Sequence, residues 1–358
     1  MAGFEPTKAA RVEESEPLRS DANIAGPTAD PVPGPRSEPA DAPGGAVDIA
    51  SSAPPPTGPA PAGRAAQQAV AAMYRTGGSL PRPESTRIMI VANQKGGVGK
   101  TTTTVNLAAS LALHGARVLV IDLDPQGNAS TALGIDHHAE VPSIYDVLVE
   151  SLPLSDVVQP VHDVEGLFCA PATIDLAGAE IELVSLVARE SRLKRAISAY
   201  EQPLDYVFID CPPSLGLLTV NALVAGAEVC IPIQCEYYAL EGLGQLLRNV
   251  ELVRGHLNPE LHVSTILLTM YDGRTRLASQ VAEEVRSHFG AEVLRTNIPR
   301  SVRISEAPSY GQTVLTYDPG SSGSLSYLEA AREIALRGVA SQHVLPQQEQ
   351  RGPVEGTQ

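Results

Sequence analysis

The stretch IVANQKGGVGKTT, residues 90–102, decides the fold of this 358-residue chain. An apolar run at residues 88–91 predicts a buried strand that enters the stretch, and apolar residues at helical spacing follow it. Glycines between a strand and a helix tolerate positive φ and let backbone N–H groups approach a phosphate at the positive end of the helix. The stretch therefore predicts a phosphate-binding loop.

The residue types in this loop indicate its chemistry. Lys100 is expected to reach the β and γ phosphates of a nucleotide, and the Thr101 hydroxyl to ligate Mg²⁺. The usual G-x-x-x-x-G-K-[ST] pattern has a glycine where this chain has Gln94, and a second lysine, Lys95, follows. Only four of the 26 basic residues are lysines, yet two of them lie here, where a compact ammonium group is favoured. The alternative, a glycine-rich turn with solvated lysines, is disfavoured by the strand, loop and helix context.

Two further predicted strands end in carboxylates. Residues 117–121 lead to Asp122 and Asp124, and residues 205–209 lead to Asp210. Ligands of open α/β sheets bind at the carboxyl ends of the strands, so these side chains are expected beside the loop. We interpret Asp210 as the carboxylate that holds Mg²⁺, through water. The alternative to a role at the phosphate loop is that Asp122 and Asp124 only cap and stabilise the turn that follows their strand.

The pattern KGGxGK[ST] resembles the deviant Walker A family of ATPases, to which MinD and ParA proteins belong. The segments DLDPQGN and DCPPS resemble ParA/Soj chromosome-partitioning proteins in particular. The resemblance implies that Asp124 orients the attacking water, that Asp122 lies near the metal, and that Lys95 reaches the partner subunit's nucleotide. The catalytic residues so implied are Lys95, Lys100 and Asp124, and the metal site comprises Thr101, Asp210 and Asp122. The residues expected to contact ATP are Lys95, Gly96, Gly97, Val98, Gly99, Lys100, Thr101, Thr102 and Pro299, the last of these in a turn near the adenine.

Strands that alternate with helices predict an α/β fold with a doubly wound, mainly parallel sheet of the P-loop NTPase type. Residues 176–200 are expected to form one long surface helix, residues 239–256 another, and residues 325–339 the last. Fifteen of the 30 prolines precede residue 84, so residues 1–85 are expected to be a disordered Pro/Ala-rich extension. Residues 86–340 would form the ATPase domain, and residues 341–358 a disordered polar tail.

Charge distribution bears on a nucleic-acid partner. The net charge is −15, but residues 271–303 carry six arginines against four acidic residues. A local basic patch of this kind binds phosphates even in an acidic chain. The resemblance implies non-specific contact with double-stranded DNA in this region, although Ser301 replaces the Asn of many relatives. The arginines expected to contact DNA are Arg274, Arg276, Arg300 and Arg303; the alternative is that they are solvated or paired with Glu283 and Glu284.

Other features argue against related classes of protein. No run of 18 apolar residues and no signal-peptide pattern is found, so we expect a cytoplasmic protein that does not bind membranes. The four cysteines lack a C-x-x-C pair, which favours free thiols over the cluster ligands of a nitrogenase-iron-protein-like reductase. A MinD-like positioning ATPase would end in a basic amphipathic helix, whereas this chain ends in a polar tail. A nucleotide-dependent scaffold with little hydrolysis stays open as an alternative.

Together the residues and the resemblance predict an ATP-dependent chromosome-partitioning protein. An ATP-induced homodimer is expected to bind DNA non-specifically at the nucleoid. A ParB-type centromere-binding partner is expected to stimulate hydrolysis and release.

Overall fold

The structure is a computed structural model that describes residues 79–240 and 243–342. Residues 1–78 of the extension predicted over residues 1–85, and residues 343–358 of the tail predicted over residues 341–358, lie outside the described part. The described chain begins with Leu80 packed against the core and with Arg82 donating to the Gly115 carbonyl at 2.6 Å. Among these residues, no helix has the length and apolar character needed to span a bilayer.

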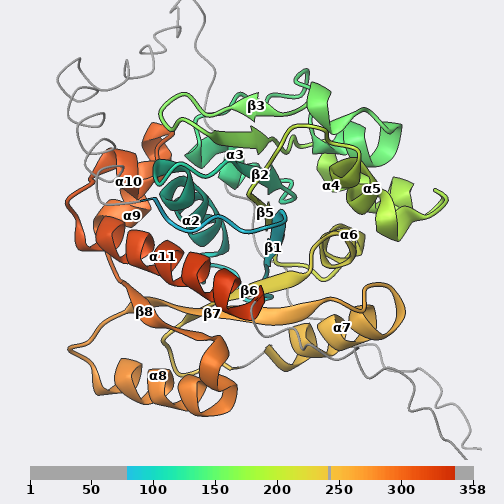
Figure 1. The fold of residues 1–358 in the computed structure, drawn as a ribbon. Helices are drawn as coiled ribbons and strands as arrows, with labels where there is room; N and C mark the ends of the chain where they lie inside the picture. The colour runs from blue at the N-terminus through green and yellow to red at the C-terminus, as the bar shows by residue number, and fades with distance from the viewer. Residues whose placement is uncertain (1–78, 241–242, 343–358) are drawn as a thin grey trace, which may run out of the picture. The chain divides into compact units, whose positions relative to one another are not determined.

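One sheet of eight strands organises the described residues (Figure 1). Its strands are β1 (Arg87–Val91), β2 (Val118–Asp122), β3 (Gln159–Pro160), β4 (Leu167–Ala170), β5 (Tyr206–Asp210), β6 (Glu228–Gln234), β7 (His262–Tyr271) and β8 (Val293–Pro299). Their spatial order is β3-β4-β2-β5-β1-β6-β7-β8, and all neighbours are parallel except β3 and β4. The predicted doubly wound, mainly parallel sheet is confirmed.

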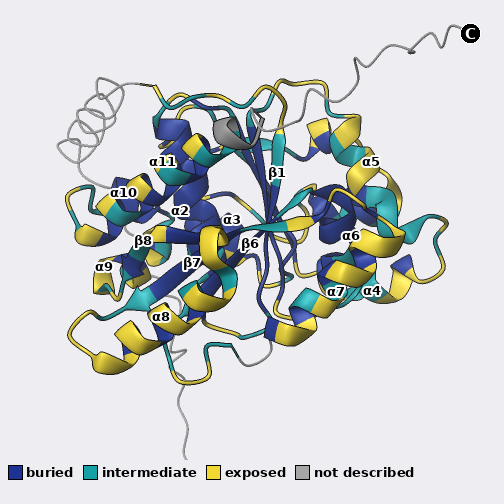
Figure 2. Cartoon of the chain, turned by 60° about the horizontal axis from the view of Figure 1, so that its bottom comes forward, coloured by how far each residue is buried: buried dark blue, intermediate teal, exposed yellow. Residues whose placement is uncertain are grey.

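Helices cover both faces of the sheet (Figure 1). One set packs in the same core cluster and consists of α2 (Lys100–Leu113), α3 (Asn128–Ala132), α9 (Val302–Glu306), α10 (Val314–Tyr317) and α11 (Ser322–Gln342). The other set consists of α4 (Leu176–Leu183), α5 (Arg192–Ser198), α6 (Leu217–Ala225), α7 (Leu243–His256) and α8 (Arg276–Phe289). The two layers of helices bury the central strands on both sides, as Figure 2 shows, and β2 and β5 are buried along their whole length.

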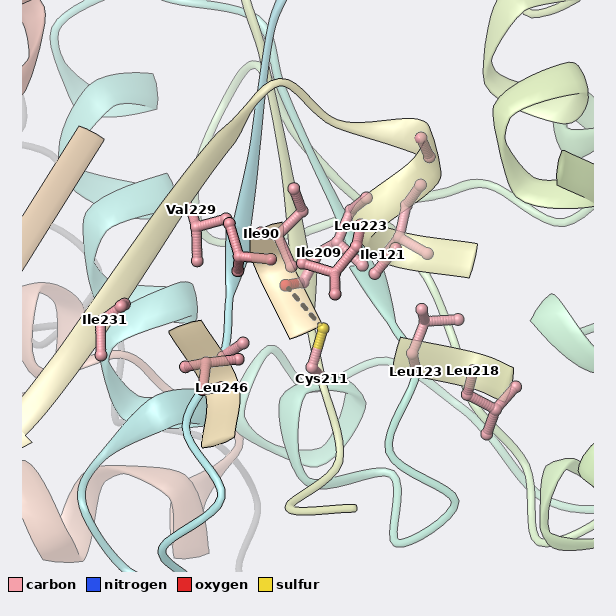
Figure 3. Close-up of a cluster of buried hydrophobic side chains, with 14 of the residues drawn as sticks. Ile90, Ile121, Leu123, Ile209, Cys211, Leu218, Leu223, Val229, Ile231 and Leu246 are labelled. Atoms are coloured by element: carbon pink, nitrogen blue, oxygen red, sulfur yellow. Dashed lines mark hydrogen bonds between the residues drawn. The ribbon is translucent and has the colours of Figure 1, made fainter. Parts of the chain in front are cut away.

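The residues of the central strands alternate between the two cores. In β1, Ile90 packs into one cluster, and Met89 and Val91 into the other, and all three are fully buried. Figure 3 shows the first cluster, which contains Ile90 together with Ile209 of the adjacent strand β5 and Ile121 of β2, the strand beyond β5. Because successive side chains of a strand point to opposite faces, a strand between two helical layers must be apolar throughout. This explains the continuous apolar runs that precede the phosphate loop and the carboxylates.

The single helix predicted over residues 176–200 is wrong. The chain instead forms α4, a connection that includes a 3-10 helix at Arg189–Ser191, and α5, and Ala188 in the connection has a left-handed φ of 53°. Leu183 of α4 and Leu193 of α5 are both fully buried in the same cluster. Apolar spacing reports which side chains face the core, so two short helices on one face produce the pattern of one long helix.

Smaller differences concern the ends of elements. α7 begins at Leu243 rather than near residue 239, and residues 241–242 lie outside the described part. α11 runs from Ser322 to Gln342, beyond both predicted ends. The two-residue edge strand β3 was not predicted, because a strand this short carries no periodicity.

Candidate functional site

The loop between β1 and α2 has the backbone that phosphate binding requires. Gly97 and Gly99 adopt φ values of 73° and 88°, and Gly99 caps the N-terminus of α2 in a left-handed conformation. A Cβ added at Gly96 or Gly97 would meet no atom within 4 Å, so the space beside the loop is open. These positions let successive N–H groups face an anion at the positive end of α2.

Two hydrogen bonds join this loop to strands β6 and β7, and a third, within the loop, orients the side chain that makes one of them. The Asn93 side chain donates to the Pro232 carbonyl of β6 at 2.8 Å and accepts from the Lys95 backbone N–H at 3.0 Å. Thr269 of β7 donates to the Val98 carbonyl at 2.8 Å. The loop is therefore held in place before a ligand binds, which lowers the entropic cost of binding. Sequence reasoning missed these anchors, because Pro232 and Thr269 are distant in the chain.

Asp210 lies at the end of β5 and faces the first turn of α2. Its two carboxylate oxygens accept hydrogen bonds from the Thr101 hydroxyl at 2.7 Å and the Thr104 hydroxyl at 2.8 Å. Thr101 and Thr104 are three residues apart, so both lie on the side of α2 that faces β5. The structure thus brings Thr101 and Asp210 together, as their expected shared metal would require, and adds Thr104, which sequence reasoning missed within the run of four threonines.

Asp122 and Asp210 are register partners on neighbouring strands and are both fully buried. Burial raises the pKa of Asp210, and the charge of Asp122 adds to this rise. Burial also raises the pKa of Asp122, although the hydrogen bonds from Ser130 act in the opposite direction and lower it. Two buried carboxyls side by side suit a divalent cation, because its charge relieves their desolvation and repulsion.

The donor set fits Mg²⁺ held together with a nucleotide. Carboxylate and hydroxyl oxygens are the hard ligands that Mg²⁺ prefers, and it usually keeps water and phosphate oxygens as its other ligands. Within the described residues, no group of three or more His, Cys, Asp or Glu side chains is placed to hold a metal alone. Thr101 and Asp210 are therefore suited to share an ion with phosphates.

Asp122 also orders the loop that carries Asp124. One of its oxygens accepts from the Ser130 N–H at 2.9 Å and from the Ser130 hydroxyl at 2.7 Å, and the other accepts from the Asp124 N–H at 3.1 Å. Asp124 is 9% exposed and accepts from the Gln126 N–H at 3.1 Å. Asp122 and Asp124 therefore do stabilise the turn, as the alternative interpretation of these residues expected, and the same hydrogen bonds fix the position of Asp124 at the site.

The Lys100 side chain is buried and interacts electrostatically with Asp210 and Asp124. Burial lowers the pKa of Lys100, while the charges of Asp210 and Asp124 favour its protonated form. The ammonium group, Asp210 and Asp124 therefore interact electrostatically in one site. A cation beside buried carboxylates at the end of a glycine-rich loop is suited to stabilise the charge of a transferring phosphoryl group.

Lys95 is ion-paired within its own chain. Its ammonium lies 3.6 Å from one carboxylate oxygen of Glu236, and the guanidinium of Arg300 lies 3.4 Å from the other oxygen. Lys95 has a side chain 35% exposed and Glu236 one 45% exposed, so this contact is at the surface and weak. Glu236, which sequence reasoning missed, thus joins the phosphate loop to the predicted DNA-binding region.

The four arginines predicted to bind DNA differ in their surroundings. Arg274 pairs with Asp272 at 2.8 Å, and its hydrogen bonds lower the pKa of Asp272 to about 2. Arg303 pairs with Glu306 at 3.1 Å and with Asp318 at 3.3 Å. Arg276, at the first position of α8, is exposed and has no ion-pair partner among the described residues. The expected alternative pairs with Glu283 and Glu284 are likewise absent from the described ion pairs.

Pro299 lies at the end of β8, with Tyr271 as its register partner on β7. Two strands, β6 and β7, separate β8 from β1 and its phosphate loop. Pro299 therefore lies on the carboxyl edge of the sheet but away from the phosphates. Its contact with the adenine stays a prediction.

Comparison with known proteins identifies the relatives of this site. Residues 86–263 match a family described as an AAA domain. The chain is 56% identical over 252 residues to the sporulation initiation inhibitor protein Soj of Bacillus subtilis, covering 70% of this chain and 99% of that protein. It is 52% identical over 253 residues to the chromosome partitioning protein ParA of Caulobacter vibrioides, covering 70% and 94%. The chain belongs to the ParA/Soj family of chromosome-partitioning ATPases.

A solved structure supports the P-loop fold of this ParA/Soj chain. The structure of cobyrinic acid a,c-diamide synthase from Mycobacterium smegmatis with a bound ATP analog and magnesium has a TM-score of 0.62. It is 40% identical and covers 72% of this chain and 97% of its own. The resemblance found in the sequence is thus confirmed. The four cysteines, all within the described residues, are free thiols and buried.

Proposed function

We propose that this ParA/Soj chain segregates DNA by an ATP-driven cycle. ATP joins two copies face to face, the dimer binds double-stranded DNA regardless of sequence, and a ParB-type partner triggers hydrolysis and release. The observation that carries the proposal is the site in which Lys100 lies among buried carboxylates beside the Thr101 and Asp210 pair. The identity to Soj over 99% of that protein supports the cellular role.

Different residues of the chain bind the phosphates, hold the metal ion and orient the water in this proposal. The backbone of residues 96–102 and Lys100 bind the phosphates, and Thr101 and Asp210 hold Mg²⁺, with Asp122 adding negative charge beside them. When bound, the ion neutralises negative charge that develops on the transferring phosphoryl group. Asp124 orients the attacking water, and its hydrogen bond from Gln126 limits the directions its carboxylate can take. Exclusion of water by a second copy would strengthen these interactions.

Lys95 acts in trans in this proposal. Its surface ion pair with Glu236 is worth about 0–1 kcal/mol, which a contact with the partner subunit's nucleotide readily replaces. Charge-assisted bonds to phosphate oxygens are stronger than an exposed pair with a carboxylate. The dimer would then form only when ATP supplies the γ phosphate.

DNA binding follows from the arginine region, of which Arg276 is the most available member. The dimer presents Arg274, Arg276, Arg300 and Arg303 twice. Repulsion from the net charge of −15 is screened beyond about 8 Å at physiological salt, so a local patch still binds phosphates. We infer that the protein acts on the nucleoid in the cytoplasm.

The experiment that tests this function uses the full chain. Analytical ultracentrifugation should show a dimer with Mg²⁺ and ATP and a monomer with ADP. Only the ATP sample should retain labelled duplexes of two unrelated sequences. Equal behaviour with ATP and ADP would contradict the proposal.

A further inference from the structure

Glu236 lies at the carboxyl edge of the sheet and shares its carboxylate between two cations. One oxygen lies 3.6 Å from the ammonium of Lys95, in the phosphate loop. The other oxygen lies 3.4 Å from the guanidinium of Arg300, which follows β8. Because β7 separates β6 from β8 in the sheet (Figure 1), these contacts join loops that strand pairing alone does not join. The phosphate loop and the predicted DNA-binding region therefore meet at one carboxylate.

The ends of the strands hold this carboxylate and its arginine partner in place. The Gln234 side-chain amide donates at 2.5 Å to the Glu236 oxygen that faces Arg300. The Glu236 N–H donates to the Gln234 carbonyl at 2.8 Å. The Arg300 N–H donates at 3.2 Å to the carbonyl of Tyr271, the last residue of β7. Such ordering lowers the side-chain entropy cost that makes many exposed ion pairs negligible.

Both cations have another ligand in the proposed function. Lys95 is assigned to the partner subunit's nucleotide, and Arg300 to the phosphates of DNA. Charge-assisted hydrogen bonds require short distances, so a cation that turns toward a phosphate oxygen loses its contact with Glu236. The same carboxylate therefore competes with both phosphate ligands.

The strength of this competition follows from exposure. The side chains of Lys95, Glu236 and Arg300 are 35%, 45% and 62% exposed. Exposed ion pairs of this kind change an equilibrium by up to about fivefold, and salt screens them further. Glu236 therefore does not prevent ATP or DNA from binding, but it raises the protein concentrations that dimerisation and DNA binding require.

We propose that Glu236 is a positioning residue that opposes ATP-induced dimerisation through Lys95 and DNA binding through Arg300. The inference rests on the proposed function, which assigns those two cations to phosphate ligands. Each step then occurs only when the phosphate contacts outweigh the contacts with Glu236. After hydrolysis both cations return to Glu236, which favours separation of the dimer and release of DNA.

The test replaces Glu236 by glutamine in the full chain, which removes the charge and keeps the size of the side chain. Ultracentrifugation with Mg²⁺ and ATP should show a dimer at least about fourfold tighter, because each dimer releases two contacts and each contact contributes about twofold or more. Fluorescence anisotropy of a labelled duplex, at protein concentrations above the dimerisation midpoint, should show DNA affinity at least about fourfold higher for the same reason. Glu236 is exposed, so the variant should fold normally, which a thermal melt checks.

A second substitution separates the two effects. In an Arg300→Ala background, Glu236→Gln should no longer raise DNA affinity, because the guanidinium that Glu236 restrains is absent. Glu236→Gln should still strengthen ATP-induced dimerisation in this background, because Lys95 is present. A residue that only supports the local structure would not produce this pattern.

Matched controls separate these contacts from a general loss of negative charge. Glu284→Gln removes an exposed carboxylate of α8 that lies about 12 Å along the helix from Arg276, beyond the screening length of about 8 Å at physiological salt. Glu329→Gln removes a carboxylate that pairs with Arg332 of α11 at 3.6 Å. Both controls should dimerise and bind DNA as wild type does.

The inference is wrong if Glu236→Gln dimerises and binds DNA as wild type does. Weaker dimerisation of Glu236→Gln would also overturn it, because Glu236 would then support the interface. A gain in DNA affinity that persists in the Arg300→Ala background would assign the gain to charge at long range and reject the contact with Arg300. A wild-type chain that stays monomeric in ATP contradicts the proposed function itself, and with it the role of Glu236.

Discussion

Charge reversal of Arg276 should abolish most of the DNA binding of the ATP dimer. Arg276 is exposed and unpaired among the described residues, whereas Arg274, Arg300 and Arg303 each contact a carboxylate. Each phosphate contact contributes a slope of about −0.9 to log K against log salt, so loss of Arg276 from both subunits flattens the slope by about two units. When salt rises from 50 to 200 mM, the wild-type dimer should therefore lose roughly tenfold more of its affinity for DNA than the variant loses.

The structure also predicts that Arg276→Glu leaves folding intact. Arg276 is at the first position of α8, whose first turn has no acidic residue. A glutamate there interacts favourably with the helix dipole, by about 0.3–1 kcal/mol, so the variant should melt no lower than wild type.

The assay is fluorescence anisotropy of a labelled duplex at several salt concentrations, with ATP and Mg²⁺. Arg332→Glu is the matched control, because it makes the same charge change at a residue of α11 that pairs with Glu329. The control should keep the wild-type slope. Arg276→Glu protein with the wild-type slope would refute the reasoning and remove α8 from the DNA interface.

Three further predictions test other parts of the account. Lys100→Ala should reduce ATP affinity beyond detection by calorimetry, since it removes the buried cation of the phosphate site; unchanged affinity would be evidence against the phosphate loop. Lys95→Ala should bind ATP as a monomer without dimerising, while the control Lys194→Ala dimerises; light scattering that reveals a normal Lys95→Ala dimer would disprove action in trans. Glu228→Gln should lower the free energy of unfolding in urea by about 1.5–3 kcal/mol, since it breaks the paired 2.7 Å contacts with Arg87. Burial opposes the ionisation of Glu228, but the hydrogen bonds and charge of Arg87 outweigh burial and lower the pKa of Glu228. The pair therefore stabilises the fold above about pH 4.3, and this stabilisation is lost as pH falls through the pKa of Glu228 in the folded state. A Glu228→Gln variant with the unfolding free energy of wild type at pH 7 would argue against the pair.

Features that depend on local pattern were predictable from the sequence. The buried strands, the glycine-rich loop and the carboxylates at strand ends all follow from apolar runs and the residues next to them. The neighbouring positions of Thr101 and Asp210 followed from a parallel sheet, because carboxyl ends of its strands share one edge. The break at Ala188 was not predictable, because the residues on both sides keep the same core-facing spacing.

Contacts between distant segments could not be read from the sequence. The sequence assigns Glu236 no role, yet this carboxylate pairs with both Lys95 and Arg300. The sheet order places β6 beside β1 and brings the loop after β6 to the phosphate loop. The exposure of Ile181 in α4 was also not predictable, because the sequence does not show which apolar residues the core leaves uncovered.

The central claim is that this site hydrolyses ATP with Asp124 as the residue that orients water. The most direct measurement is phosphate release by Asp124→Ala with Mg²⁺, ATP and duplex DNA, beside ultracentrifugation of the same sample. Gln126→Ala is the control, because it alters an exposed side chain of the same loop and keeps the backbone N–H that donates a hydrogen bond to Asp124. We predict turnover lower by about 10²-fold or more for Asp124→Ala, with the ATP dimer retained. Turnover within a few-fold of wild type would contradict the claim and leave Asp124 as a turn residue.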